Sequence, residues 1–393
     1  MDQLLLGGQR PLYMKIPFAQ PWITVDDRRA VDAVLEGPVL THGPQVEEFE
    51  KEFSAFLGDG ANSVAVSSCM AALHLAYVLL GIGHGDEVIV PAQTHVATAH
   101  AVELVGARPV FVDCEVETGN VSPEQVESAI TPNTKAISVV HFLGISVRML
   151  DVIALAESHG LMVIEDCALA LGSRYAGTHV GLFGDVGCFS FYPVKHITSG
   201  EGGMFVTRHS DLAAKARLFR SFGTERSPQQ SGKYDVSSLG LNYRLNELGS
   251  AMGRSQLRRI EQNLALRARN FLALKTALAG LPFLSVLDTH DAAGLSSHYC
   301  LSVLLRAPLS EARDSIMSEL REMGIGTSIY YPHPVPRLQY YQRKYGWDSR
   351  QFLIAQQISD HTIALPVGPT LAASDASAIA EAFVAACTAR ASQ

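Results

Sequence analysis

The chain has 393 residues, 47% of them hydrophobic, with a mean hydropathy of +0.13. This length exceeds what one core usually organises, so we expect two domains, residues 1–250 and residues 251–393. The formal net charge of −8 argues against nucleic acid as a partner, because such binding generally needs a concentrated basic face.

The spacing of the cysteines and the length of the apolar runs exclude further classes of protein. The six cysteines are widely scattered, with no CxxC pair and no histidine cluster at zinc-ligand spacing, so neither a disulfide framework nor a metal site is predicted. The apolar start, Leu4–Leu6, is too short for a secretory segment. Serines and a histidine interrupt the uncharged run at residues 63–85, so we expect no membrane span and a cytoplasmic protein.

Strand-like and helix-like segments alternate through the first half of the chain. Apolar runs predict strands at residues 64–66, 87–90, 110–113, 136–141, 161–166, 187–191 and 204–207. Such alternation is typical of a mainly parallel sheet covered by helices. A long helical region at residues 247–278 then leads to a smaller domain, with a strand near residues 298–304 and helices near 310–323 and 374–387.

The first candidate site segment is VAVSSCMAALHLAYVLL, a strand followed by a turn of small residues and a helix. We expect the turn at residues 67–70 and the helix from Ala71. Amides at the start of such a helix, helped by the hydroxyls of Ser67 or Ser68, can bind an anion. The alternative is an ordinary strand-to-helix junction in which Ser68 caps the helix.

Asp166 ends the apolar run LMVIED, which is typical of a fully buried strand. Acidic residues at the carboxyl ends of such strands point into ligand crevices in open α/β sheets. The alternative is a helix N-cap, since aspartate is common where a helix follows a strand.

Lys195 lies between an aromatic run and a glycine-rich turn in FSFYPVKHITSGEGG. A lysine held in this way can form a Schiff base with pyridoxal phosphate, although a solvated loop lysine would show the same local pattern. Pyridoxal phosphate also needs an acid for its pyridine nitrogen, which Asp166 can supply, and a phosphate site, which the turn at residues 67–70 can supply. The three segments together therefore favour a pyridoxal phosphate site.

Seven segments, in this order, resemble the DegT/StrS family of sugar aminotransferases, and the resemblance covers nearly the whole chain. They are residues 43–53, 85–102, 107–113, 129–144, 164–172, the Lys195 segment and 240–257. The resemblance implies an α/β fold of the aspartate aminotransferase type (fold type I), with a mainly parallel seven-stranded sheet covered by helices and a smaller C-terminal α/β domain. It also implies pyridoxal 5'-phosphate as cofactor.

The resemblance assigns roles to individual residues. Lys195 would form the Schiff base and carry the proton, and Asp166 would pair with the pyridine nitrogen. Ser190 falls where the family places a serine on the cofactor phosphate, and Ser68 of the turn described above is expected to bind the same phosphate. Asn242 aligns with an asparagine that reaches the phosphate from the neighbouring subunit, which implies a homodimer with shared active sites.

Four residues at cofactor-binding positions depart from the family's pattern. Cys69 and Met70 stand where Gly-Thr is usual, so a threonine hydroxyl on the phosphate is lost. Leu169 replaces a glutamine or histidine that contacts the phenolic oxygen of the cofactor. His95 replaces the aromatic residue that stacks on the ring, and an imidazole can still stack. These departures affect cofactor affinity and substrate preference more than reaction class.

The implied activity is a ping-pong transfer of an amino group from an amino acid, L-glutamate by resemblance, to a nucleotide-linked keto sugar. Tyr330, Tyr331 and His333 could line the sugar pocket, and a minority of the arginines at residues 254–269 could meet a diphosphate. Alternatives are a pyridoxal-dependent sugar dehydratase, an aminobenzoate-type synthase, or a non-catalytic regulatory member. Sugar dehydratases of the family carry histidine at the lysine position, so Lys195 argues against them, although His196 is adjacent.

Overall fold

The computed structural model describes residues 15–58, 60–226, 234–289 and 291–391. A seven-stranded sheet lies at its centre, with the strand order β1-β9-β8-β5-β4-β2-β3. The strands are β1 (Asn62–Val66), β2 (Glu87–Pro91), β3 (Arg108–Val112), β4 (Thr134–Val140), β5 (Met162–Asp166), β8 (Val186–Ser190) and β9 (Gly203–Thr207). Only β9 runs against the other six, pairing antiparallel with both β1 and β8. The predicted mainly parallel sheet is confirmed, and its predicted strand limits hold to within about two residues.

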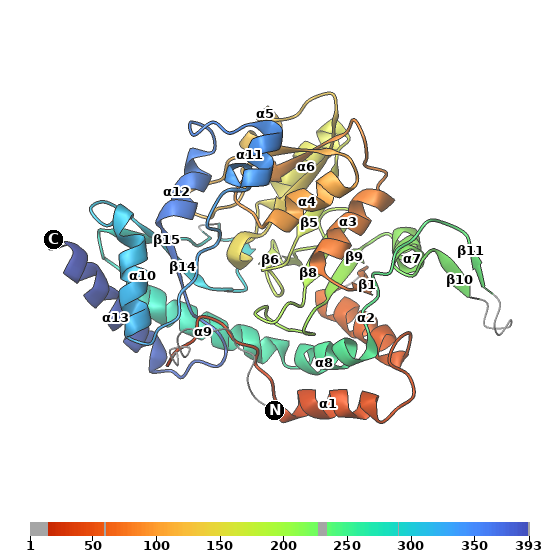
Figure 1. Cartoon of the computed structure of the whole chain (residues 1–393), viewed down its shortest axis with the longest axis horizontal. Helices are drawn as coiled ribbons and strands as arrows, with labels where there is room; N and C mark the ends of the chain where they lie inside the picture. Colours follow the sequence, from red (N-terminus) through yellow and green to blue (C-terminus); the bar gives the residue numbers. More distant parts are fainter. Residues whose placement is uncertain (1–14, 59, 227–233, 290, 392–393) are drawn as a thin grey trace.

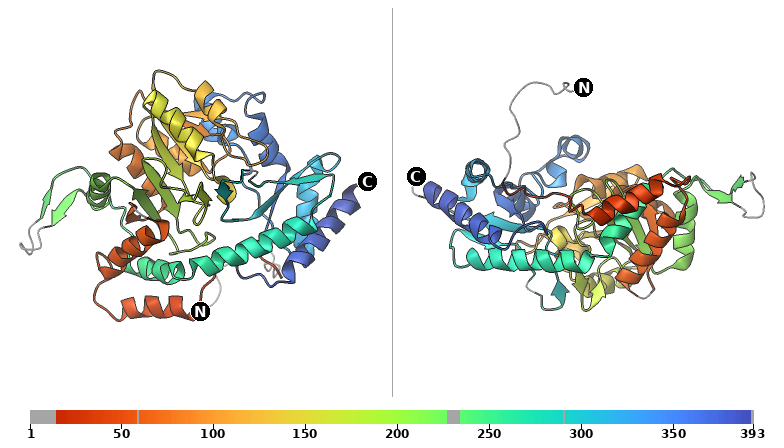
Figure 2. Two further views of the ribbon diagram at one scale, coloured as in Figure 1. Left: turned by 180° about the vertical axis from the view of Figure 1, so that it is seen from behind. Right: turned by 90° about the horizontal axis from the view of Figure 1, so that it is seen from below.

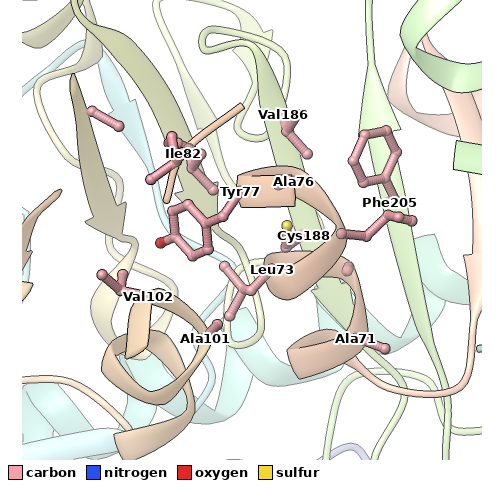
Figure 3. Packing of buried hydrophobic residues seen from close by; sticks show 14 of the residues in the cluster. Ala71, Leu73, Ala76, Tyr77, Ile82, Ala101, Val102, Val186, Cys188 and Phe205 are labelled. Atoms are coloured by element: carbon pink, nitrogen blue, oxygen red, sulfur yellow. The ribbon is translucent and has the colours of Figure 1, made fainter. Parts of the chain in front are cut away.

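Side chains alternate between the two faces of this sheet and so belong to two sets of helices. In β2, for example, Val88 and Val90 join one core cluster while Ile89 joins another. The first cluster packs under α3 (Cys69–Leu79), α4 (Val96–Leu104) and α7 (Ser210–Phe219). Figure 3 shows Leu73 and Tyr77 of α3 inside this cluster. Buried strands with helices on both faces match the expected α/β class.

The opposite face is covered by two groups of helices. Aromatic residues of α2 (Pro44–Leu57) pack on β8 and the segment after it, with Phe53 5.3 Å from Phe189 and 5.6 Å from Phe191 between ring centres. Farther along the sheet, α6 (Met149–His159) covers β4 and β5, with α5 (Pro123–Ser128) beside it. Two outer helices, α1 (Val25–Leu35) and α8 (Glu247–Leu257), pack on each other, and α8 also packs on α2.

A smaller unit follows, built on a three-stranded antiparallel sheet of β12 (Leu284–Val286), β14 (Leu301–Leu305) and β15 (Thr362–Leu365). Three helices pack with this sheet in a core of their own: α9 (Ile260–Ala277), α10 (Arg313–Glu322) and α13 (Asp375–Ala391). Figures 1 and 2 show α9 running from the large sheet toward this unit. The predicted smaller α/β unit is therefore confirmed. The predicted domain boundary at residues 250 and 251 falls within α8 and stays a prediction.

The remaining described elements are short. They are α11 (Gln339–Tyr345), α12 (Leu353–His361), the small sheet of β6 (Arg174–Tyr175), β7 (Thr178–His179) and β13 (Gly294–Leu295), the hairpin of β10 (Thr224–Arg226) and β11 (Tyr234–Val236), and the 3-10 turns η1 (Phe142–Gly144), η2 (Ser310–Ala312) and η3 (Val335–Arg337). The hairpin projects from the body of the molecule beyond α7 (Figures 1 and 2). Among the helices described, none has the length and apolar character needed to cross a membrane.

The long helix predicted at residues 247–278 is wrong in one respect, because it is broken into α8 and α9. The break lies at Arg258 and Arg259, and Arg259 leaves helical geometry at φ −115° and ψ 17°. The side chain of Arg259 binds the carboxylate of Asp27, donates to the carbonyl of Trp22 at 2.7 Å and lies 5.2 Å from the Trp22 ring centre. Tertiary contacts with the N-terminal segment thus accompany a turn that the sequence pattern does not reveal.

Candidate active site

Asp166 stands at the carboxyl end of the central strand β5 and is 5% exposed. Its Oδ2 accepts a hydrogen bond of 2.8 Å from the hydroxyl of Thr98, and its Oδ1 accepts one of 3.0 Å from the amide of Ala168. The thiol sulfur of Cys69 lies 3.9 Å from Oδ1. Among the described residues, no basic nitrogen approaches this carboxylate within 4 Å, so its charge is free to pair with a cationic ligand.

Lys195 reaches the same site from the segment that follows β8. Its amide donates to the carbonyl of Tyr192 at 2.9 Å, which forms a tight turn, and the side chain is half-buried. Burial lowers the pKa of Lys195, while the nearby carboxylate of Asp166 opposes this shift. A lowered pKa leaves more of the amine neutral near pH 7, which is the form that acts as nucleophile and base.

The turn predicted to bind an anion lies at the start of α3. Ser68 caps this helix, its hydroxyl accepting from the amide of Ala71 at 3.0 Å, and the helix begins at Cys69 rather than at the predicted Ala71. The amides of Cys69 and Met70 lie in the first helical turn, where a helix offers them no acceptor, so they are available to a phosphate. The Ser68 cap does not use these two amides, so capping and anion binding, which sequence reasoning treated as alternatives, are compatible in one turn.

Gly203, the first residue of β9, allows the chain to pass directly beneath this turn. A Cβ at that position would lie 2.4 Å from the carbonyl carbon of Ser68 and 2.6 Å from the amide nitrogen of Cys69. Both contacts are with backbone atoms, which a side-chain rotation cannot relieve. The glycine-rich segment after Lys195 is therefore required by the close approach of two backbones.

Cys69, which departs from the family's usual glycine, lies beside Asp166 and donates toward the carbonyl of Cys188 at 3.5 Å. Burial raises the pKa of the Cys69 thiol well above its usual range, and the charge of Asp166 adds to the shift. The thiol therefore stays neutral and is not a nucleophile. It fills space beside the carboxylate without introducing a charge.

His95 is the N-cap of α4, with Nδ1 accepting from the amide of Ala97 at 3.2 Å. Partial burial keeps the pKa of His95 below its ordinary value, so the imidazole is neutral near pH 7. Its ring meets the ring of Tyr331 edge to face, with 5.6 Å between centres. The geometry gives a neutral aromatic ring at the position where the sequence predicts a stacking partner.

The other predicted cofactor residues have different surroundings. Leu169 is buried among apolar side chains, and only its carbonyl is engaged, accepting from the hydroxyl of Ser297 at 3.2 Å. The hydroxyl of Ser190 accepts from the amide of Tyr192 at 3.4 Å. Asn242 is exposed and pairs through its backbone with Ser221, and no side-chain hydrogen bond joins it to these site residues within the described part of the chain.

Two of the three predicted pocket residues lie close to the site. Tyr331 packs on His95, and the hydroxyl of Tyr330 is 2.8 Å from that of Tyr299, a residue just before β14. His333, in contrast, is exposed and accepts from Nε of Arg337 at 3.1 Å. The tyrosines are thus placed to contact a ligand, and His333 belongs to the surface of the loop.

His196, the neighbour of Lys195, faces the core. Its Nε2 lies 3.1 Å from the carbonyl of Ser297, and its own carbonyl accepts from Asn263 at 2.6 Å. Burial lowers the pKa of His196 well below its usual range. Lys195, and not His196, is therefore the residue near Asp166. The structure does not support an alignment in which His196 occupies the lysine position.

Three buried residues have the composition of a metal site: His141, Glu165 and Cys167. Their hydrogen bonds, however, are made to the protein backbone and to one another. Glu165 accepts from the amides of Gly181, Phe183 and Gly184 at 2.7–2.8 Å and lies 3.1 Å from Nε2 of His141. Nδ1 of the same imidazole accepts from a backbone amide at 3.1 Å. Because these lone pairs are in use, the group fixes the loop before β8 and offers little to an ion.

Sequence reasoning missed Thr98 and Tyr299. Thr98 holds the carboxylate of Asp166 and is itself 2.8 Å from the hydroxyl of Thr94. The ring centre of Tyr299 lies 5.3 Å from Nζ of Lys195. The only sequence signal for Thr98 is a hydroxyl in the first turn of a helix that starts at the sheet edge. Tyr299 is about one hundred residues from Lys195 in the chain, so no local sequence pattern reveals their contact.

Residues 21–384 match the profile of the DegT/DnrJ/EryC1/StrS aminotransferase family. The chain belongs to this family. The family predicted from seven segments is thereby confirmed, and with it the assignment as an aminotransferase enzyme.

Among individual relatives of this DegT-family chain, the spore coat polysaccharide biosynthesis protein SpsC of Bacillus subtilis is 36% identical over 374 residues, or 93% of this chain and 96% of that protein. The solved PseC of Helicobacter pylori, an aminotransferase of pseudoaminic acid biosynthesis, has a TM-score of 0.90 at 29% identity, covering 94% of this chain and 98% of that one. The putative sugar aminotransferase Spr1654 of Streptococcus pneumoniae has a TM-score of 0.89 at 27% identity, with 95% and 99% covered. It has been solved in forms named for pyridoxamine and pyridoxal phosphate. These structures confirm the fold expected from the sequence.

Proposed function

We propose that this family member transfers an amino group from L-glutamate to a nucleotide-linked keto sugar, with pyridoxal 5'-phosphate as cofactor and Lys195 as its Schiff-base lysine. The observation that carries the proposal is that Lys195 and Asp166 share one site, next to the amides that open α3. Family membership, with a relative solved in its pyridoxal phosphate form, supports the same assignment.

The residues present fit this cofactor. The carboxylate of Asp166 is buried without a cationic partner within 4 Å among the described residues, which matches a protonated pyridine nitrogen. The amides of Cys69 and Met70, with the hydroxyls of Ser68 and Ser190, would hold the phosphate. When bound, the cofactor withdraws electrons from the substrate carbon and stores the amino group between the two half-reactions.

The protein contributes positioning and proton transfer. Thr98 fixes the orientation of Asp166, so that the acid faces a single direction. Lys195, whose pKa burial lowers, has a larger neutral fraction than an ordinary lysine, and its amine could take a proton from the substrate carbon. The neutral ring of His95 would stack on the cofactor without adding a charge.

A shared active site between two subunits is part of the proposal. Asn242 is exposed in the single chain, and three apolar side chains near it are exposed as well: Phe222 at 49%, Val236 at 54% and Leu239 at 81%. Exposed apolar groups gathered in one region are typical of a protein–protein contact. A second copy of the chain placed against them would bring Asn242 toward a phosphate, as the family resemblance implies.

The lysine assignment is tested by absorbance. Purified protein supplied with pyridoxal phosphate should show a visible band from the Schiff base, and L-glutamate should shift it. Lys195→Ala should lack the band, whereas Lys135→Ala, which removes an exposed lysine, should keep it. A wild-type protein that binds the cofactor without any visible band would refute the assignment.

The substrate assignment needs a second measurement. L-glutamate and a panel of keto sugars, with and without a nucleotide, are incubated with the loaded protein and followed by mass spectrometry. The proposal expects amino sugar and 2-oxoglutarate in equal amounts, and only from nucleotide-linked sugars. A deoxygenated sugar without an amine would point to the dehydratase alternative, and no turnover of any sugar would point to a regulatory role.

A further inference from the structure

Tyr299 is fixed beside Lys195 by contacts on several sides. It is 4% exposed, and its ring centre lies 5.3 Å from Nζ of Lys195. Its hydroxyl is 2.8 Å from that of Tyr330, its amide donates to the carbonyl of Leu143 at 3.3 Å, and its carbonyl accepts from Nη1 of Arg267 at 2.9 Å. Because both the main chain and the hydroxyl are held, the ring keeps its place against the lysine.

The charged and titratable groups that face Lys195 come from several elements. Asp166 ends β5, Cys69 begins α3, His95 caps α4, and His196 follows in the chain. No carboxylate oxygen lies within 4 Å of Nζ among the residues that the structure describes. The amine of Lys195 is instead in close contact with the aromatic face of Tyr299.

A ring and a carboxylate would hold this amine differently. A carboxylate at contact distance would keep the lysine protonated and would compete with its release as a base. An aromatic face attracts the ammonium moderately and has no comparable hold on the neutral amine. The contact with Tyr299 therefore suits a lysine that alternates between the two forms.

We propose that Tyr299 is a positioning residue, whose ring holds the ammonium form of Lys195 inside the site while its nitrogen is not bonded to the cofactor. The inference rests on the role proposed above for Lys195. The hydroxyl pair with Tyr330 orients the ring, and the bond from Arg267 to the Tyr299 carbonyl fixes its backbone. Tyr299 acts through the lysine and takes no proton itself.

The test varies the electron density of the ring without changing its shape. Tyr299→Phe serves as the reference, and phenylalanines with one, two and three fluorines are then placed at position 299, since each fluorine weakens the attraction of the ring face for a cation. The pKa of Lys195 is measured in the full-length, cofactor-free chain by competitive amine labelling and mass spectrometry. The exposed Lys135 is the internal reference.

We expect the pKa of Lys195 to fall stepwise with each fluorine, by about one unit over the series, while that of Lys135 stays constant. A flat series would overturn the proposal and leave Tyr299 as a space-filling residue. If Tyr299→Phe does not fold, the series is made with O-methyltyrosine and its fluorinated forms, whose oxygen can still accept a hydrogen bond and cannot ionise.

This measurement is independent of the cofactor, so the two proposals can fail separately. A flat series in a protein that shows the visible band would overturn the role of Tyr299 alone. A stepwise series in a protein that shows no band would overturn the function proposed for Lys195 and leave the contact established.

Discussion

Individual side chains determine the orientation of the Asp166 carboxylate. Asp166 can be inferred from its place at the end of an apolar run, but its orientation comes from Thr98 on α4, 68 positions earlier in the chain. A carboxylate that accepts a hydroxyl and an amide is fixed in one rotamer, and a fixed acid meets a ring nitrogen without reorganising. We therefore expect Thr98 to affect cofactor binding.

Replacing this threonine by valine tests that role. Thr98→Val keeps the shape and removes the hydrogen bond to a charged group, so we expect pyridoxal phosphate to bind about ten- to a hundredfold more weakly. The dissociation constant is measured by absorbance titration. Thr94→Val is the matched control, because the Thr94 hydroxyl contacts that of Thr98 and, within the described part of the chain, makes no hydrogen bond to Asp166. Its effect on the dissociation constant should stay below about threefold. Equal effects of the two variants would contradict this role.

At the level of elements, α1 is attached to α8 and α9 by one nearly buried ion pair. Asp27 of α1 is 1% exposed and binds both Nη atoms of Arg259 at 2.6–2.8 Å, in the turn that separates the two later helices. Its Oδ2 also accepts from the amide of Thr24, closing the capping box that begins α1. One carboxylate therefore starts a helix and fastens it to the rest of the molecule.

Asp27→Asn should lower the free energy of unfolding by about 3 kcal/mol, because a nearly buried guanidinium is left without its counter-ion. Denaturant unfolding at neutral pH measures this change. Asp26→Asn is a matched control on the same helix, since Asp26 and Arg29 are both about three-quarters exposed, and it should change stability by less than about 0.5 kcal/mol. Similar losses in both variants would contradict the assignment.

The same pair predicts a pH dependence. Burial alone would raise the pKa of Asp27, but hydrogen bonds with Arg259, Thr24 and Ser255 outweigh it and lower the pKa from 3.8. A carboxylate with a lowered folded-state pKa contributes stability that is fully present above 3.8 and is lost as the pH falls through the folded value. The difference between wild type and Asp27→Asn should therefore shrink in acid.

For the whole molecule, the proposed shared site predicts that two inactive variants can restore activity together. In the proposed dimer, Lys195→Ala and Asn242→Ala remove groups that belong to the same site but come from different subunits. In a mixed dimer, one site lacks both residues and the other is intact. After random exchange of equal amounts, we expect about a quarter of wild-type activity, since half of the dimers are mixed and each has one working site.

Amino sugar formation is the readout, and each variant incubated alone is the control. Activity of the mixture that does not exceed the average of the separate variants would contradict a shared site. Recovery limited to conditions that allow subunit exchange would strengthen it, because the effect then depends on forming new dimers.

Much of the fold follows from local patterns. The strands of the large sheet are continuous apolar runs, and runs of that kind are stable only with helices on both faces, so their existence and approximate limits were predictable. The break between α8 and α9 was not predictable, because residues 258–259 fit a helical pattern and contacts of Arg259 with Trp22 and Asp27 accompany the turn. Helical propensity is a weak preference that tertiary contacts override.

The candidate site divides in the same way. Lys195, Asp166 and the turn at Ser68 are marked by their positions at strand ends, which the order of residues alone reveals. The ring of Tyr299 on Lys195, the hydroxyl of Thr98 on Asp166 and the inward face of His196 come from packing between distant segments. Sequence determined which groups meet at the sheet edge, since strand order and direction bring strand ends together. Only the tertiary structure decided how each group is oriented and charged, because burial and hydrogen bonding depend on neighbours far away in the chain.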